Sequence, residues 1–331
     1  MKKFLSLMMA AAMALSLVAC GSGSTESGET STSGETSTTE AQNLNLATGG
    51  TSGTYYAVGG ALGSTMKGKL QLSEITVNST GASKANVFLI DDGDADLAIL
   101  QSDVLAYAHE GTALFETDGV VDSALWVAGL YNETVQIICS TDITDIEQLR
   151  GKSVCVGDVG SGTEFNAKQV LEAYGMTFDD INAVNGSFSD GVESLKDKKV
   201  SAAFTVAGAP TTAIVDLAMT NEFNMLSLSE DAVKYLTEKY TFLTLDPLPA
   251  GTYSGIDHEV DCVAVKAVLV ASKDLSEDVV YELVKGMFDN QDALATAHAK
   301  FSLLSPEGAV AGASADLHPG AAKYYSEIGV I

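Results

Sequence analysis

Short strand-like runs alternate with helix-like runs from residue 44 to residue 331, and this alternation limits the folds open to the chain. Strands alternating with helices are typical of βαβ units and parallel sheets. The predicted fold class is therefore α/β. Strands are predicted at 44–47, 75–78, 97–100, 126–130, 135–140, 154–157, 202–206, 242–245 and 263–271, and helices at 55–66, 83–90, 102–109, 163–174, 210–219, 230–239 and 277–288.

The first twenty residues have the order of a lipoprotein export signal. Lys2 and Lys3 precede an apolar run, and a small residue, Ala19, stands before Cys20. The run is short for a bilayer span, and its order is that of a cleaved signal peptide. We expect residues 1–19 to be removed and Cys20 to carry lipid that anchors the protein to the cell membrane on its extracytoplasmic side. The alternative, a free cytosolic cysteine, does not fit the segment that follows.

Residues 20–43 are expected to form the lipidated cysteine and a disordered tether. After Cys20 this segment consists almost entirely of Gly, Ser, Thr and Glu, which bury too little apolar surface to order a backbone. A flexible chain of this length has a reach of about 25 Å. The tether would therefore lift a folded body off the membrane surface.

The chain is strongly acidic, with a formal net charge of −26. Removing residues 1–19 takes away two lysines and no acidic residue, so the charge becomes −28. Such a body repels nucleic acid and anionic lipid head groups, and we expect no nucleic-acid partner. Otherwise the charge indicates solubility and does not identify a ligand.

The cysteines and histidines indicate neither a disulfide framework nor a metal site. Cys139, Cys155 and Cys262 each lie in an apolar, strand-like run, which favours buried thiols, although a Cys139–Cys155 bridge stays open. The four histidines lack metal-ligand spacing. We expect no metal and no cofactor.

Five strand-to-helix junctions share a turn rich in Gly, Ser and Thr. In an open α/β sheet such junctions meet at the carboxyl edge of the strands, where ligands bind, and helix N-termini there suit an anion. Each turn alone is also explained as a helix cap. Five at one edge favour a binding site. The junctions are 48–55, 78–83, 101–103, 160–163 and 207–210.

Motifs for nucleotide binding and for catalysis fail at these junctions. Gly160-Ser161-Gly162 lacks the third glycine of a dinucleotide loop, and Ile146 stands where a phosphate loop before Lys152 needs its first glycine. Ser161 has no hydrolase elbow around it and no histidine near it in sequence. We expect that the chain is not an enzyme. A lipid-anchored surface enzyme using the same sheet edge is the alternative.

Seven sequence strings, in order and spanning nearly the whole chain after the tether, resemble the TAXI family of solute receptors. They are LATGGTSGTYY (46–56), DLAILQSD (96–103), LRGK (149–152), GSGTEFNA (160–167), VAGAP (206–210), PAGTY (249–253) and HPGA (318–321).

This resemblance implies an extracytoplasmic solute-binding protein of a tripartite ATP-independent periplasmic (TRAP) transporter, with two α/β lobes of the type II periplasmic-binding fold and a ligand cleft between them. Lobe 1 would comprise residues 44–136 and 262–331, and lobe 2 residues 137–261, with crossovers near 134–140 and 260–272. The family is associated with glutamate, glutamine and related small carboxylates. A small anionic or zwitterionic ligand, TRAP membrane subunits as partners and a monomeric protein are therefore expected.

The family pattern also implies which residues bind the ligand. Hydroxyl groups and neighbouring backbone N–H groups suit a carboxylate, and Gln101 or Asp103 would accept from a ligand amine. Tyr55 either contacts the ligand or belongs to the core. The implied set is Thr51, Ser52, Thr54, Tyr55, Ser79, Thr80, Gly81, Ser83, Gln101, Asp103, Ser161, Gly162, Thr163, Gly208 and Pro210.

Several neighbouring residues have open or structural interpretations. Lys84 replaces an apolar residue of the family pattern, and it is either a surface residue or an added cation in the cleft. Arg150, the only arginine of the chain, is expected to position a loop in lobe 2. Trp126 is expected in the core, whereas Asn86 and Glu164 either support the site or face solvent.

The anchoring hypothesis makes one direct prediction. Cys20→Ala removes the only sulfur available for lipid attachment at the cleavage site, so intact protein should appear in the medium and not in the membrane fraction. Fractionation followed by immunoblotting measures this. A variant that stays with the membrane after a salt wash would show that anchoring does not depend on Cys20.

Overall fold

The structure, a computed structural model, describes residues 43–68 and 74–331. The predicted signal peptide, Cys20 and the tether up to residue 42 lie outside the described residues. Asn43, predicted to end the tether, is instead the first residue of a strand. Within the described part, no helix combines the length and the apolar character that crossing a membrane requires.

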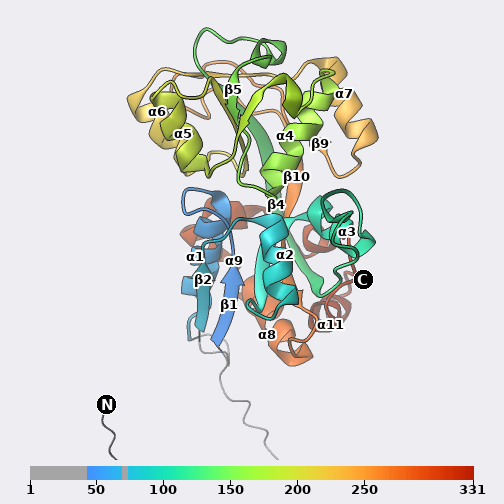
Figure 1. The fold of residues 1–331 in the computed structure, drawn as a ribbon. Coiled ribbons are helices and arrows are strands. Elements are labelled where there is room, and N and C mark those ends of the chain that lie inside the picture. The colour runs from blue at the N-terminus through green and yellow to red at the C-terminus, as the bar shows by residue number, and fades with distance from the viewer. Residues whose placement is uncertain (1–42, 69–73) are drawn as a thin grey trace, which may run out of the picture. The chain divides into compact units, whose positions relative to one another are not determined.

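One sheet of ten strands runs through the described residues, in the order β2-β1-β3-β10-β4-β7-β5-β6 (Figure 1). β8 pairs with β4, and β9 pairs with β10. Pairing is parallel within β1–β3 and within β5–β7, and antiparallel where β10 and β4 join these two groups. The strands are β1 (Asn43–Ala47), β2 (Glu74–Asn78), β3 (Leu97–Gln101), β4 (Ala124–Cys139), β5 (Ser153–Cys155), β6 (Asn182–Val184), β7 (Ala202–Ala207), β8 (Asn224–Met225), β9 (Thr244–Leu245) and β10 (Val263–Ser272).

Helices connect and cover these strands. All seven predicted helices are present, within a few residues of their expected bounds. No element was predicted at α5 or from α9 to α11. The α-helices are α1 (Thr54–Met66), α2 (Ser83–Asp91), α3 (Ser102–Glu110), α4 (Gly162–Ala173), α5 (Phe188–Lys196), α6 (Thr212–Thr220), α7 (Glu230–Lys239), α8 (Glu277–Asp289), α9 (Gln291–Ala297), α10 (Pro306–Val310) and α11 (Pro319–Glu327). The short 3₁₀ helices are η1 (Ala113–Phe115), η2 (Ile146–Leu149), η3 (Phe178–Asp180) and η4 (Ala299–Leu303).

β4 corrects the sequence prediction of two separate strands at 126–130 and 135–140. It is a single strand of 16 residues. The polar residues Asn132, Glu133 and Thr134 do not interrupt it, because they pair with Lys266, Val265 and Ala264 of β10. A partner strand far away in the sequence thus supplies the hydrogen bonds that the local residue pattern does not predict.

Four hydrophobic cores divide the described residues into two lobes. Two cores contain side chains of β1–β3, α1–α3 and α8–α11, which we call the first lobe. The other two contain side chains from the segment between β4 and β10, together with the adjoining ends of these two strands, which we call the second lobe. Along β4 the side chains change core between Tyr131 and Val135, and along β10 between Val265 and Ala267. The predicted boundaries at residues 136 and 261 lie close to these points and stay a prediction.

The core residues behave as their sequence context predicts. Trp126 is fully buried, and its Nε1 donates to the Ala309 carbonyl over 2.8 Å. Cys139, Cys155 and Cys262 are buried free thiols, so the alternative of a Cys139–Cys155 bridge is wrong.

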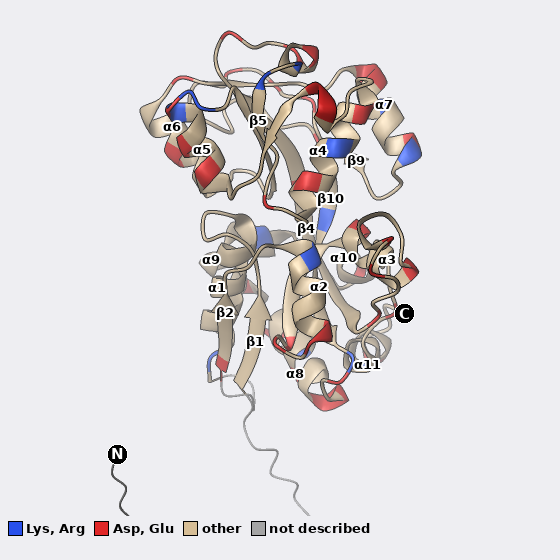
Figure 2. Cartoon of the chain, in the orientation of Figure 1, with Lys and Arg blue, Asp and Glu red and all other residues tan. Residues whose placement is uncertain are grey.

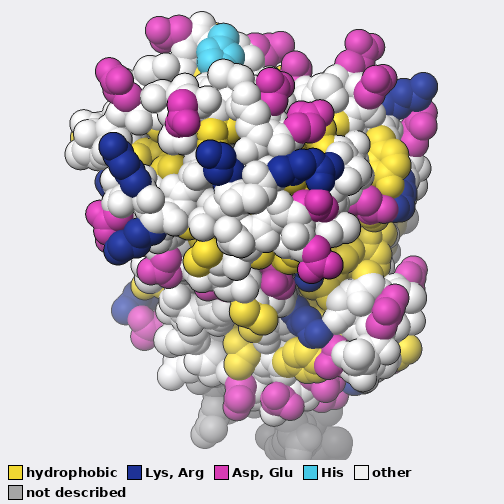
Figure 3. Space-filling model, turned by 45° about the horizontal axis from the view of Figure 1, so that its top comes forward, with side chains coloured by type: hydrophobic (Ala, Val, Ile, Leu, Met, Phe, Trp, Pro, Cys, Tyr) yellow, Lys and Arg dark blue, Asp and Glu magenta, His cyan; other side chains and the backbone are white. Residues whose placement is uncertain are grey.

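Charged side chains lie on the outside of both lobes. Acidic residues are spread over α5, α7 and α8, among other elements (Figure 2). The face in Figure 3 carries acidic side chains among basic and apolar ones. This distribution supports the interpretation of the net charge as a source of solubility.

Candidate functional site

A cavity lies where the two lobes meet, and residues of both lobes line it. Its volume is about 40 Å³, enough for a few water molecules. Pockets for small molecules usually measure about 300 Å³ or more. In this arrangement of the lobes the cavity is smaller than such a pocket. The lining residues are Gly49, Gly50, Gly53, Thr54, Tyr55, Ala82, Ser83, Gln101, Glu133, Asp158, Ser161, Gly162, Thr163, Ser187, Phe188, Val206 and Ala207.

Four helices begin at this cavity. Thr54, Ser83, Gly162 and Phe188, the first residues of α1, α2, α4 and α5, all line it. The strands before these helices end there because parallel strands bring their carboxyl ends to one edge of a sheet. Four helix N-termini supply unpaired N–H groups and partial positive charge at one place, which suits an anion.

Each of the five predicted junctions contributes at least one lining residue. A sixth junction, from β6 to α5, was not predicted, because β6 is only three residues long and all three are surface residues. Seven residues of the predicted binding set line the cavity: Thr54, Tyr55, Ser83, Gln101, Ser161, Gly162 and Thr163.

The other predicted residues lie outside the lining, and several of them shape the loops. Ser79 Oγ donates to the Gly49 carbonyl over 2.9 Å, and Thr80 Oγ1 donates to the Thr48 carbonyl over 2.9 Å. Thr51 and Pro210 are exposed. Ser52, Gly81, Asp103 and Gly208 are also not among the lining residues.

Residues with open interpretations now have defined partners. Asn86 is fully buried, and its Nδ2 donates to the carbonyls of Thr48 and Ile99 over 2.6 and 2.8 Å, so it supports the first loop and does not face solvent. Glu164 accepts from the backbone N–H of Gly160 over 2.9 Å and thereby fixes the loop before α4.

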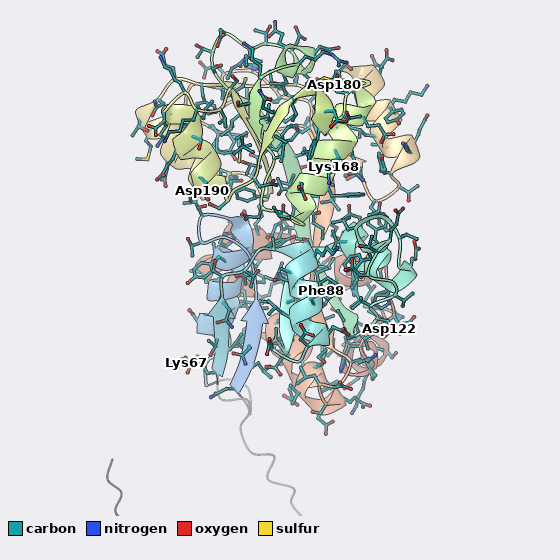
Figure 4. All side chains as sticks on the ribbon, in the orientation of Figure 1. Lys67, Phe88, Asp122, Lys168, Asp180 and Asp190 are labelled. Atoms are coloured by element: carbon teal, nitrogen blue, oxygen red, sulfur yellow. The ribbon has the colours of Figure 1, made fainter. Side chains whose placement is uncertain are left out.

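The two basic residues considered in the sequence analysis, Lys84 and Arg150, form their polar contacts with groups outside the cavity lining. Lys84 Nζ donates to the Leu114 carbonyl over 2.6 Å and to Asp118 Oδ2 over 2.7 Å. Arg150 forms an ion pair with Asp180, 2.5 Å from Nη1 to Oδ1. Asp180 lies at the end of the second lobe remote from the first (Figure 4). Neither Lys nor Arg occurs among the residues that line the cavity.

Glu133 is the lining residue that the sequence analysis missed. It lies inside β4, is 2% exposed, and its Oε2 accepts from the hydroxyl of Tyr55 over 2.5 Å. Burial raises the pKa of Glu133 well above its ordinary value, and the nearby Asp103 carboxylate adds to the rise, against the lowering effect of Tyr55. The sequence signal that could have identified Glu133 as a site residue was a single acidic residue between two apolar runs.

Beside Glu133, buried polar side chains link the two lobes. Gln101 Nε2 of the first lobe donates to Asn166 Oδ1 of the second over 3.0 Å, and Asn166 Nδ2 donates to Gln169 Oε1 over 2.8 Å. Asp103 is buried nearby, and desolvation raises its pKa to about 6. Buried atoms without a hydrogen-bond partner, among the described residues, include Gln101 Oε1, Asp103 Oδ2, Tyr131 Oη and Gln169 Nε2.

Further contacts hold the lobes together around the cavity. Thr54 Oγ1 donates to the Gly208 carbonyl over 2.9 Å, and Ser189 Oγ donates to Ser52 Oγ over 2.7 Å. On another side, the ring of Tyr107 from α3 packs edge-on against Phe165 from α4, with centroids 5.3 Å apart. The predicted residues Thr54, Ser52 and Gly208 thus meet across the lobes.

Comparison with known proteins identifies the family. The family model described as the NMT1-like family matches residues 46–329, which is most of the chain. The chain belongs to the NMT1-like family.

Solved structures similar to this NMT1-like chain have low sequence identity to it. A protein of Bordetella bronchiseptica RB50 is 13% identical, with a TM-score of 0.52, over 87% of this chain and 83% of its own. PhnD1 from Prochlorococcus marinus (MIT 9301), solved in complex with methylphosphonate, is 11% identical, with a TM-score of 0.51, over 79% and 90%. The periplasmic aliphatic sulphonate-binding protein SsuA from Escherichia coli is 12% identical, with a TM-score of 0.44, over 86% and 83%. The likeness is one of fold, and the expected α/β class with two type II periplasmic-binding lobes is confirmed.

The contact between Gly162 and Gln101 makes a testable prediction about the lobes. A Cβ added at Gly162 would lie 1.8 Å from Gln101 Oε1, so Gly162→Ala should hold the lobes further apart. We expect a larger radius of gyration by small-angle X-ray scattering. Gly60→Ala in α1, where a Cβ meets nothing within 4 Å, is the matched control and should not change it. Equal radii for Gly162→Ala and the unaltered protein would contradict the close approach.

Proposed function

We propose that this protein captures a small carboxylate or amino acid, of the glutamate or glutamine kind, between its lobes and delivers it to a membrane transporter. The observation that carries the proposal is the cavity at the meeting point of the lobes, where four helix N-termini and residues of all five predicted junctions come together. Such a place in an α/β sheet is where ligands bind.

The cavity offers groups for a carboxylate without a basic side chain. Helix N-termini supply N–H donors, and the lining hydroxyls of Ser83, Ser161 and Thr163 add donors next to them. A charge-assisted hydrogen bond contributes about 1.5–3 kcal/mol and a neutral one about 1 kcal/mol. Several such bonds together would hold a ligand carboxylate.

Ligand capture would act on the equilibrium between open and closed lobes. A ligand that contacts both lobes stabilises the closed state by its differential affinity for that state. The contacts between Thr54 and Gly208 and between Gln101 and Asn166 close the lobes to a cavity too small for a ligand, so they would break when a ligand enters, and the lobes would close around it less tightly. The membrane partner would then recognise the closed form.

The resemblance of seven strings to the TAXI family supports a TRAP-type membrane transporter as this partner. The lipid on Cys20 and the tether of residues 20–43 would keep a monomeric protein beside that transporter, on the extracytoplasmic side. The fold shared with PhnD1 and the protein of Bordetella bronchiseptica RB50 is compatible with this role.

Side-chain roles in the cavity favour a binding protein over a surface enzyme. Ser161 Oγ, the nucleophile that an enzyme would need here, accepts from the Glu164 backbone N–H over 3.1 Å and caps α4. Among the described histidines, His109 and His318 have ring nitrogens bound to the carbonyls of Ala124 and Leu275. Among the described residues, Ser161 Oγ forms no hydrogen bond to a histidine or carboxylate that could act as its base.

Closure on ligand binding is the first prediction of this function. The radius of gyration from small-angle scattering should fall when saturating L-glutamate or L-glutamine is added, because the ligand favours the closed lobes. Native mass spectrometry of the purified protein would show whether a small molecule is already bound. An unchanged scattering profile, with binding confirmed by calorimetry, would contradict capture by closure.

Distributed recognition of the carboxylate is the second prediction. Thr163→Val removes a hydroxyl from the cavity and should weaken ligand binding by about tenfold in titration calorimetry. Thr51→Val makes the same substitution at an exposed position outside the cavity, and Arg150→Lys alters a residue engaged with Asp180, so both controls should bind normally. A large loss confined to Arg150→Lys would contradict this site.

A further inference from the structure

Glu133 occupies an unusual position for a carboxylic acid. It lies in the interior of β4, paired with Val265 of β10, at the place where these two strands pass from one lobe to the other. It is nevertheless one of the residues that line the cavity, and it is 2% exposed. Burying a carboxyl group in a strand is unfavourable unless the group has partners, so its retention here calls for a ligand or a structural role.

The groups facing Glu133 come from every element around it. Tyr55 of α1 donates its hydroxyl to Oε2, and Gln101 of β3 and Asp103 of α3 lie near the carboxyl group. Lys300 of η4 and Tyr131 of β4 are also close enough to interact with it electrostatically. The only full positive charge in this group is Lys300, and it does not line the cavity.

Three buried polar atoms around Glu133 lack a hydrogen-bond partner. Two are acceptors, Gln101 Oε1 and Asp103 Oδ2, on residues that are 2% and 1% exposed, and the third is the Tyr131 hydroxyl, which can donate. Gln101 and Asp103 both interact with Glu133. Buried acceptors without donors are costly, and three acidic or carbonyl groups together attract a group that is positively charged and rich in N–H donors.

We propose that Glu133, supported by Gln101 and Asp103, forms a subsite for the protonated primary amine of the ligand. This inference rests on the proposed function, since it concerns one end of a ligand whose carboxylate lies at the helix N-termini. An amine has three N–H donors, which would meet the acceptors of Glu133 and Gln101 in the cavity lining, while the buried Asp103 adds negative charge behind them. Ligands with the same carboxylates and no amine would leave the subsite unpaired and would bind more weakly.

Binding at this subsite would also release a proton. Burial raises the pKa of Glu133, so its carboxyl group keeps a proton to a higher pH than an exposed glutamate does. An ammonium group beside it favours the ionised form and lowers that pKa. The ligand therefore arrives as an ammonium ion, the carboxyl group of Glu133 becomes a carboxylate, and its proton goes to solvent. Affinity should rise with pH between the pKa of Glu133 in the complex and the raised pKa in the free protein.

Two other carboxyl groups with raised pKa values must be distinguished from Glu133. Desolvation raises the pKa of Asp103 to about 6, and burial together with Asp190 raises the pKa of Asp158, which lines the cavity on the second lobe. Asp103→Asn and Asp158→Asn therefore accompany Glu133→Gln in the experiment. Glu116→Gln alters an exposed carboxylate of the first lobe and is the matched control.

The experiment compares L-glutamate with glutarate, which has the same two carboxylates and lacks the amine. Titration calorimetry in phosphate and in Tris, whose ionisation enthalpies differ, gives both the affinity and the number of protons released. In the unaltered protein we expect glutamate to bind about thirtyfold more tightly than glutarate, with release of up to about one proton. Glu133→Gln should abolish most of the preference and the proton release, whereas Glu116→Gln should keep both.

The possible outcomes separate this inference from the proposed function. The role of Glu133 is overturned, and ligand capture stays intact, if glutamate and glutarate bind equally well. The same holds if proton release persists in Glu133→Gln but is lost in Asp103→Asn or Asp158→Asn. If neither glutamate, glutamine nor glutarate binds, the proposed ligand class is wrong and the inference falls with it.

A second variant covers a failure of Glu133→Gln to fold, which circular dichroism would reveal. Tyr55→Phe removes the hydroxyl that donates to Glu133 and keeps the carboxyl group. Loss of that donor disfavours the ionised form, so the rise of glutamate affinity should shift to higher pH. A pH profile identical to that of the unaltered protein would overturn the proposal.

Discussion

The antiparallel pairing of β4 with β10 is the constraint on which the rest of the structure depends. Both strands pass through both lobes, so the two groups of parallel strands belong to one sheet and are held in a fixed register at its centre. Because β1–β3 on one side and β5–β7 on the other end at the junction of the lobes, the helix N-termini of both lobes face the same cavity. If the lobes separate as proposed, bending of these two paired strands would widen the site and keep its register.

The sequence predicts much of this arrangement because its turns carry a chemical signature. A strand followed by a turn rich in Gly, Ser and Thr and then by a helix is recognisable locally, and all five such junctions reach the cavity. The junction between β6 and α5 lacks the first part of that signature, since β6 is short and lies at the surface. A strand of this kind exists because it pairs with β5, and the local sequence contains no trace of that pairing.

Glu133 was missed for a related reason. The residues around it interrupt an apolar pattern, and a local interpretation places a break in the strand there. Residues of β10, more than a hundred positions away, provide the pairing that keeps the segment extended and buries the carboxyl group. The same limit applies to Lys84. The sequence leaves open whether it is a surface residue or a cation in the cleft, because it does not show that Asp118 and the Leu114 carbonyl lie within reach of Nζ.

Residue type also does not distinguish a hydroxyl that binds a ligand from one that shapes a loop. Ser79 and Thr80 hold the carbonyls of Gly49 and Thr48, while Ser83 lies in the lining of the cavity a few residues later. Both tasks require a short side chain with a hydrogen-bond donor. Part of the predicted set lines the cavity, and another part, including Ser79 and Thr80, fixes the backbone around it.

The charges around the cavity explain how an acidic protein could retain a ligand that carries a carboxylate. Helix N-termini give one part of the cavity partial positive charge, and Glu133 gives another part negative charge or the capacity for it. A zwitterion oriented with its carboxylate at the helix ends satisfies both parts, and the reverse orientation satisfies neither. A simple anion meets only the helix ends and leaves buried acceptors unpaired. Because Arg150 and Lys84 are engaged elsewhere, selectivity in this cavity would depend on the pattern of charge along the ligand and not on a single basic side chain.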